Sequence, residues 1–160
     1  MMQKRYLLIG LFFILLSCTE EVKVTPFTFP KAFTGETQRS WVMRSFQILR
    51  EGKGAITLLP TDILIDCVAD DIYTFYYDSQ RTYRVTDGSA KCNSGDPDTI
   101  VESSWAFVNS TAALTIIMPI FSDQPLPFIL REVDDTKMVL DIYFDDESSY
   151  RLNFRQTSHD

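Results

Sequence analysis

The stretch that decides the fold runs from Cys67 to Cys92 and reads CVADDIYTFYYDSQRTYRVTDGSAKC. It contains two runs rich in aromatic and β-branched residues, 72–77 and 81–86, separated by a polar break at 78–80. Two such runs around a short polar break predict a β-hairpin. One cysteine lies beyond each open end of this hairpin, so a bond between Cys67 and Cys92 would hold the two ends together.

The rest of the chain from Trp41 onward repeats the same β pattern. Short apolar or alternating runs are separated by Gly, Pro, Asp, Asn and Ser at a spacing of roughly 8–12 residues. Besides the hairpin, the predicted strands cover 41–49, 55–59, 63–67, 99–108, 114–118, 128–133, 138–144 and 150–155. This series predicts an all-β fold, an up-and-down antiparallel β-barrel of about eight strands, which leaves no open sheet edge. A two-sheet β-sandwich is the alternative.

The last two predicted strands specify their own register. The side chains expected to face the core are Met138, Leu140, Ile142, Phe144, Tyr150, Leu152 and Phe154. The residues between them, including Asp141 and Arg151, are expected to face outward. A slip of one residue would turn those charged side chains into the core, so the pattern allows only one pairing.

The N-terminus carries the features of an export signal. Lys4 and Arg5 precede an apolar run, residues 6–16, which is too short for a membrane-spanning helix. The run ends in Leu-Leu-Ser followed by Cys18. This ending resembles the lipobox of bacterial lipoproteins, in which a small residue precedes the cysteine that becomes the mature N-terminus. A plain secretory signal with an incidental cysteine is the alternative.

The lipobox resemblance implies that residues 1–17 are a signal peptide and that Cys18 is lipidated, so that acyl chains anchor the protein in a membrane. The acidic residues 19–21 resemble the short signal that sends some Gram-negative lipoproteins to the cell exterior. We therefore expect an outer-membrane lipoprotein that faces the periplasm or the cell surface. Residues 18–35 are expected to form a flexible tether, and residues 36–157 the barrel domain.

The composition fits one acidic domain. The chain has 160 residues, of which 45% are hydrophobic, and a net charge of −7. This length suffices for a single core. The basic residues do not cluster, which argues against nucleic-acid binding.

The cysteines remaining after Cys18 are Cys67 and Cys92. An exported compartment favours a disulfide between them. Two buried thiols or a metal site are the alternatives. A metal site would need more ligands, and the single histidine, His159, lies next to the C-terminus.

The order of these signals resembles that of a known domain. Trp41 lies in the first strand, Cys67 precedes an acidic pair and an aromatic strand, Cys92 follows a Gly-containing turn, and Trp105 precedes a loop. This order resembles the lipocalin-like domain of small bacterial (Gram-negative) lipoproteins, although Trp41 lacks the usual preceding glycine. The resemblance covers about residues 36–157. It implies a barrel of lipocalin type and no established ligand.

The chain contains none of the short motifs that mark hydrolases, zinc proteases or phosphate-binding loops. Because the one histidine lies in the C-terminal tail, we expect neither an enzyme nor a cofactor. Acidic residues cluster at 70–71, 96–98, 134–135 and 145–147, and solvated acids are the expected interpretation. Calcium between Asp96 and Asp98 is the alternative for the second cluster.

The aromatic residues carry the functional expectation, which is binding of a small, mostly apolar ligand in the barrel. The residues expected to line the ligand pocket are Trp41, Phe75, Trp105, Phe107, Phe128, Ile142 and Phe154. The alternative is a non-catalytic interaction module with a filled barrel, whose loops contact an unknown cell-surface protein. An internal void with an open mouth would favour the first function.

Overall fold

The computed structural model describes residues 29–108, 111–145 and 147–157. The expected signal peptide (1–17), the expected lipidation site Cys18 and His159 lie outside the described residues.

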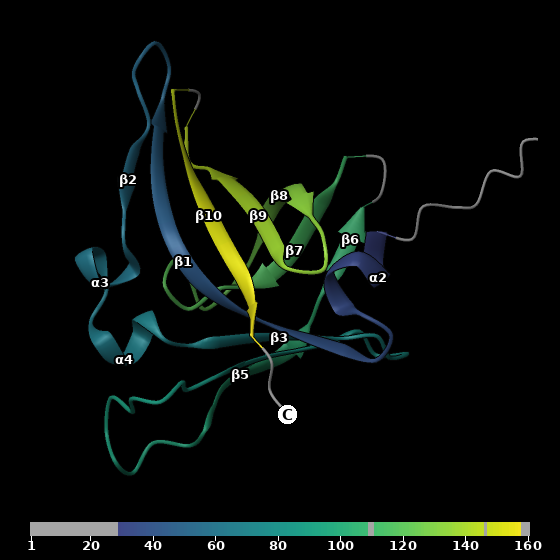
Figure 1. The fold of residues 1–160 in the computed structure, drawn as a ribbon. Coiled ribbons are helices and arrows are strands. Elements are labelled where there is room, and N and C mark those ends of the chain that lie inside the picture. The colour runs from purple at the N-terminus through teal and green to yellow at the C-terminus, as the bar shows by residue number, and fades with distance from the viewer. Residues whose placement is uncertain (1–28, 109–110, 146, 158–160) are drawn as a thin grey trace, which may run out of the picture.

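The fold is all-β, with short helices outside the sheet (Figure 1). In chain order the elements are α2 (Phe29–Thr34), β1 (Gln38–Arg50), β2 (Ile56–Leu58), α3 (Pro60–Ile63), α4 (Asp66–Ala69), β3 (Ile72–Tyr76), β4 (Thr82–Thr86), β5 (Thr99–Ser104), β6 (Ala106–Val108), β7 (Ala113–Ile117), β8 (Pro125–Val133), β9 (Lys137–Tyr143) and β10 (Ser148–Thr157). None of the described helices is long and apolar enough to cross a bilayer.

The strands form one antiparallel sheet in the order β5-β4-β3-β1-β10-β9-β8-β7-β6. β2 pairs with residues 46–48, in the C-terminal half of β1. The two ends of this order are neighbours in the chain, because only Trp105 separates β5 from β6. β5 pairs with β4, and β6 pairs with β7, so one run of chain joins both edges of the sheet. With β2 set aside, the other nine strands make a nearly closed, up-and-down barrel, and they amount to eight when β5 and β6 are counted as one. The predicted fold class is confirmed.

The predicted strand at 63–67 is wrong. α3 and α4 occupy this region instead. Pro60 stands at the first position of α3, where its fixed φ suits a helix and its missing N–H costs no hydrogen bond. The side chain of Asp62 accepts a hydrogen bond from the Leu59 backbone N–H at 2.7 Å, which satisfies a donor at the start of the helix. These local signals outweigh the apolar run that follows them.

The interior follows the predicted alternation, with one correction. Met138, Leu140 and Ile142 of β9 are buried in the core, as are Leu152 and Phe154 of β10. Phe144 was expected to face the core, but 55% of it is exposed. The reason is that β9 ends at Tyr143, so Phe144 lies in the hairpin turn beyond the barrel wall.

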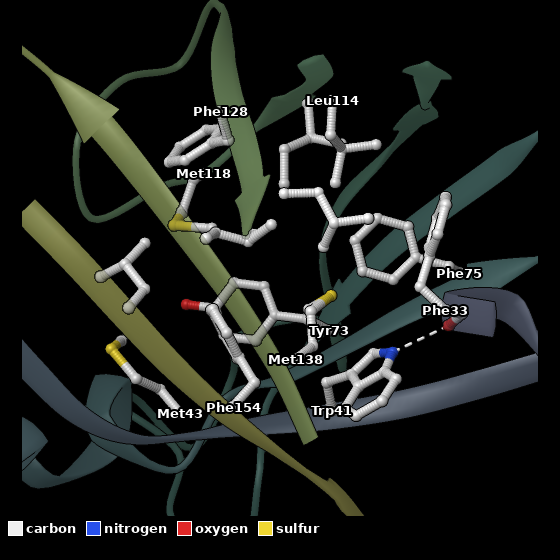
Figure 2. Close-up of a cluster of buried hydrophobic side chains, with 14 of the residues drawn as sticks. Phe33, Trp41, Met43, Tyr73, Phe75, Leu114, Met118, Phe128, Met138 and Phe154 are labelled. Atoms are coloured by element: carbon white, nitrogen blue, oxygen red, sulfur yellow. Dashed lines mark hydrogen bonds between the residues drawn. The ribbon is translucent and has the colours of Figure 1, made fainter. Parts of the chain in front are cut away.

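One end of the barrel, here called the α2 end, is closed by α2 together with the turns at 77–81 and 134–136. Phe33 of α2 is fully buried, and its ring meets those of Phe75 and Trp105 edge-on at centroid distances of 5.2 and 5.0 Å. The indole Nε1 of Trp41 donates a hydrogen bond to the Phe33 carbonyl at 2.9 Å (Figure 2). α2 lies within the segment expected to be a tether, and its contacts make it part of the folded domain.

The opposite end, here called the disulfide end, consists of the connections 59–71, 87–98 and 118–124. Cys67 of α4 is bonded to Cys92 of the β4–β5 loop, with a Cα–Cα distance of 5.1 Å. The predicted disulfide is therefore confirmed, and it lies at the open end of the β3–β4 hairpin. Figure 1 shows α3 and α4 on the side of the barrel away from α2.

Candidate functional site

The aromatic residues expected to line a ligand pocket lie together in the core. Phe107 is partly buried, and the other six are buried: Trp41, Phe75, Trp105, Phe128, Ile142 and Phe154. They belong to one hydrophobic cluster, of which Figure 2 labels Trp41, Phe75, Phe128 and Phe154. Their expected role in ligand binding stays a prediction.

A pocket of about 390 Å³ opens at the disulfide end. Its wall is mainly apolar and includes the disulfide itself. The lining residues are Leu64, Cys67, Val68, Asp71, Asp87, Cys92, Asp96, Pro97, Thr99, Ile100, Pro119 and Ile120. The volume lies within the range of small-molecule sites, which are typically apolar clefts with a few placed polar groups. Here the polar groups are carboxylates.

Two of these carboxylates, Asp71 and Asp87, face each other across the β3–β4 hairpin. In the register of the two strands, Tyr73 pairs with Val85. Counting two residues outward along each strand places Asp71 opposite Asp87. Because side chains alternate along a strand, both acids share the inner face of the barrel with Tyr73 and Val85. Only 2% of Asp71 is exposed, and both acids line the pocket.

Each of the two acids has a buried oxygen without a hydrogen-bond partner in the described part of the chain. Among the described residues, nothing donates a hydrogen bond to Oδ1 of Asp71 or to Oδ2 of Asp87, although both atoms are buried. Burial, and after it the charges of Asp87 and Asp70, together raise the pKa of Asp71 to about 7. Near neutral pH the Asp71 carboxyl is therefore only partly ionised. An ordinary aspartate would be fully ionised there.

Two tyrosine hydroxyls lie deeper on the same inner face. Tyr73 is 1% exposed and Tyr83 is fully buried, and neither hydroxyl has a hydrogen-bond partner in the described part of the chain. Burial raises the pKa of both phenols, and the charge of Asp71 adds to each effect. Figure 2 shows Tyr73 inside the core, where its ring meets Phe154 at a centroid distance of 5.4 Å. The polar groups thus extend from the pocket wall into the barrel.

Asp70 has a structural role beside the pocket. Its Oδ2 accepts hydrogen bonds from the Ser89 N–H at 2.6 Å, the Ser89 hydroxyl at 2.8 Å and the Ala90 N–H at 3.0 Å. Gly88 lies so close to Asp70 that a Cβ atom there would overlap the Asp70 carbonyl oxygen. A side chain at this position would push the loop outward, so glycine is needed for the approach. These contacts hold the β4–β5 loop over the pocket.

The expectation of solvated acids is confirmed at the turns and wrong at Asp71. Asp134 accepts backbone hydrogen bonds from Thr136 and Lys137, and Asp145 accepts them from the residues after it, as turn acids do. Asp98 pairs with Lys91. Among the described residues, no three His, Cys, Asp or Glu side chains group in a way that could hold a metal ion.

Sequence reasoning missed the pocket, although one signal for it was present. Asp71 precedes Tyr73 and Phe75 by steps of two, and strand alternation places all three on one face. An acid on the inner face of a barrel strand is unusual, and it marks a candidate site. The pocket walls were out of reach because they come from three connections that are distant in the sequence.

The comparisons with known proteins add no assignment. No protein-family model matches this chain, and no curated protein matches it.

Proposed function

We propose that this protein is a membrane-anchored, lipocalin-like lipoprotein that binds a small, mostly apolar ligand without chemical conversion. The observation that carries the proposal is the pocket of about 390 Å³ at the disulfide end. Apolar walls supply most of the affinity for a small molecule by removing its surface from water, and a few polar groups fix its orientation. Both kinds of group are present here.

The difference between the two ends of the barrel supports a ligand site at the disulfide end. Phe33 fills the α2 end and packs against the buried aromatic residues below it. The disulfide end carries Val68, Ile100 and Ile120 around open space. A ligand would therefore enter between α4 and the loops 87–98 and 118–124.

The proposed location rests on the sequence at the lipobox, Cys18, and is in keeping with a disulfide, since disulfides persist in exported proteins. Two or three acyl chains on Cys18 would anchor the protein stably at the outer membrane, facing the periplasm or the cell surface.

The test is native mass spectrometry of the full-length protein purified from its own host membranes. We expect a mass that begins at a triacylated Cys18, together with a small molecule bound in stoichiometric amount. In the variant Val68→Trp the indole occupies the pocket, and the bound molecule should be lost. The matched control is Val108→Trp, at a residue that is 50% exposed and does not line the pocket; it should keep the ligand.

An interaction module is the second candidate, and one observation favours it. Three exposed aliphatic side chains follow one another between β2 and α4: Leu59 (58% exposed), Ile63 (40%) and Ile65 (67%). Exposed apolar groups of this kind are common at protein contacts. A folded natural protein that carries no bound small molecule would reject the carrier and favour this module.

A further inference from the structure

The pocket has a charge pattern that restricts the ligand it can accept. Asp71 and Asp87 lie opposite each other at the ends of β3 and β4, and both line the pocket. Each has a buried oxygen with no partner in the described chain. Like charges placed directly opposite each other on two strands destabilise the pair. A buried polar group that is left unsatisfied also costs stability. A cationic group between the two acids would offset both costs, and no cation of the described residues hydrogen-bonds to either acid.

The neighbouring charged side chains are already engaged. The ammonium of Lys91 donates to the Asp98 carboxylate and to the Asp96 carbonyl. Asp70 is satisfied at Oδ2 by the loop residues Ser89 and Ala90, whereas its buried Oδ1 has no partner among the described residues. Lys91 also attracts Asp87 electrostatically, but no cation of the described residues forms a hydrogen bond or an ion pair with either acid. A cationic group on the ligand would supply the charge that the described residues do not place there.

We infer that the ligand of this pocket is an apolar molecule with a basic nitrogen, and that Asp71 and Asp87 hold its ammonium group. This inference rests on the proposed function. An ammonium group has donors for several acceptors and neutralises the repulsion between the acids. A carboxylate ligand would add a third negative charge. The apolar body would lie against Val68, Ile100 and Ile120.

The test compares three probes of equal chain length: n-hexylamine, n-hexanol and hexanoate. Each is titrated into the full-length protein at pH 8, and the methyl signals of Ile100 and Ile120 are followed by NMR. We expect hexylamine to bind about ten- to a hundredfold more tightly than hexanol, which is the usual effect of a charge-assisted hydrogen bond. Hexanoate should bind most weakly.

Two variants assign the preference to the carboxylates. Asp71→Asn and Asp87→Asn keep the shape of the side chain, and each should reduce hexylamine affinity about tenfold while leaving hexanol affinity unchanged. The matched control is Asp123→Asn, which removes the same charge from an exposed residue at the same end of the barrel. It should change nothing. The near-ultraviolet circular dichroism of each variant checks that the fold is kept.

The outcomes separate the inference from the function on which it rests. If hexanol binds as tightly as hexylamine, or if the Asn variants keep the preference for the amine, the inference is overturned and the carrier stands. If Asp123→Asn lowers amine affinity as much as Asp71→Asn, the effect is one of general surface charge, and the inference is again overturned. If no probe shifts the two isoleucine signals, the proposed carrier function is rejected together with the inference.

Discussion

Two regions of this barrel each bury an aspartate, and the two acids have opposite properties. Asp141 lies on the outer face of β9 and is 1% exposed, while Asp71 lines the pocket at the disulfide end and is 2% exposed. Their burial is nearly equal, so burial alone does not explain the difference. What differs is the set of groups around each carboxylate.

Asp141 is enclosed by arginines from the two neighbouring strands. Arg151 of β10 donates from Nε at 2.8 Å and from Nη2 at 2.9 Å, and Arg131 of β8 donates from Nε at 2.7 Å. Burial pushes the pKa of Asp141 upward, but the hydrogen bonds from Arg151 and Arg131 outweigh it, and the pKa lies below its usual value. This carboxylate is charged, satisfied and stabilising.

Asp71 has acids near it where Asp141 has arginines. Burial and the neighbouring Asp87 and Asp70 raise its pKa to about 7. The contrast teaches that a buried acid with all its partners belongs to the scaffold, whereas a buried acid without them is a candidate binding group. The following predictions test this contrast.

The largest effect is expected from removal of the disulfide by the double variant Cys67→Ser/Cys92→Ser. The bond joins cysteines that are 25 residues apart, and the chain-entropy relation gives a loss of about 3.5 kcal/mol in the free energy of unfolding. Because water would then reach the loosened pocket, the pKa of Asp71 should fall toward its ordinary value, while that of Asp141 should not change.

Denaturant unfolding measures the first quantity, and carboxyl-carbon NMR titration measures the second. If the pKa of Asp71 stays near 7 in the double variant, the closed disulfide end is not what desolvates this acid.

The next largest effect is expected from Arg151→Met, which keeps an apolar side chain over Asp141 but removes its two hydrogen bonds. Leaving a buried charge partly unpaired should lower the free energy of unfolding by about 3 kcal/mol. Since the folded pKa of Asp141 is depressed, the stabilisation is present above the ordinary pKa and is lost as the pH falls through the folded value. The cost of the substitution should therefore shrink in acid.

Urea unfolding at pH 7 and at pH 3 measures this cost. Arg155→Met is the matched control, because Arg155 lies on the same face of the same strand and is exposed; it should change stability by less than about 0.5 kcal/mol. Equal losses in the two variants would contradict the special role of Arg151.

The smallest effect is expected from Asp71→Asn, and it has the opposite sign. Asp71 ionises more easily in the unfolded protein than in the folded one, because its pKa is raised by folding. The free energy of unfolding therefore falls as the pH rises from about 4 to about 7. A neutral amide removes this penalty. The variant should be more stable than the natural protein at pH 8, by on the order of 2 kcal/mol after allowance for screening by water at the mouth.

Thermal unfolding at pH 8 and at pH 4 measures the difference, which should be much smaller at pH 4, where Asp71 is protonated in the folded state and about half protonated in the unfolded state. A destabilised variant at pH 8 would show that the charged form of Asp71 has a partner within the protein, and it would weaken the case for a binding site there.

Local patterns predicted most of the barrel. The alternation in β9 and β10 gave their inward faces and left Asp141 and Arg151 together on the outer face, because a period of two is a property of a single strand. The cysteines around the β3–β4 hairpin gave the disulfide. α3 was missed because Pro60 and Asp62 start a helix within an apolar stretch that reads as a strand.

The candidate site was harder to predict, because its properties depend on pairs of segments. Asp71 is buried through its position opposite Asp87 and beneath the connections around it, and the sequence alone gives no register for these. The depressed pKa of Asp141 likewise needs arginines from β8 and β10, which become neighbours only when β9 lies between them.

The pairing of β1 with β10 also has a consequence for how the chain reaches this fold. These strands pair from Ser40↔Thr157 to Arg50↔Ser148, so the first barrel strand finds its partner in the last described one. Contacts between such distant segments form slowly. Until β10 has been made, β1 and β9 each keep an unpaired edge. A chain interrupted before β10 would therefore have two unpaired strand edges, which could pair with other chains and cause aggregation.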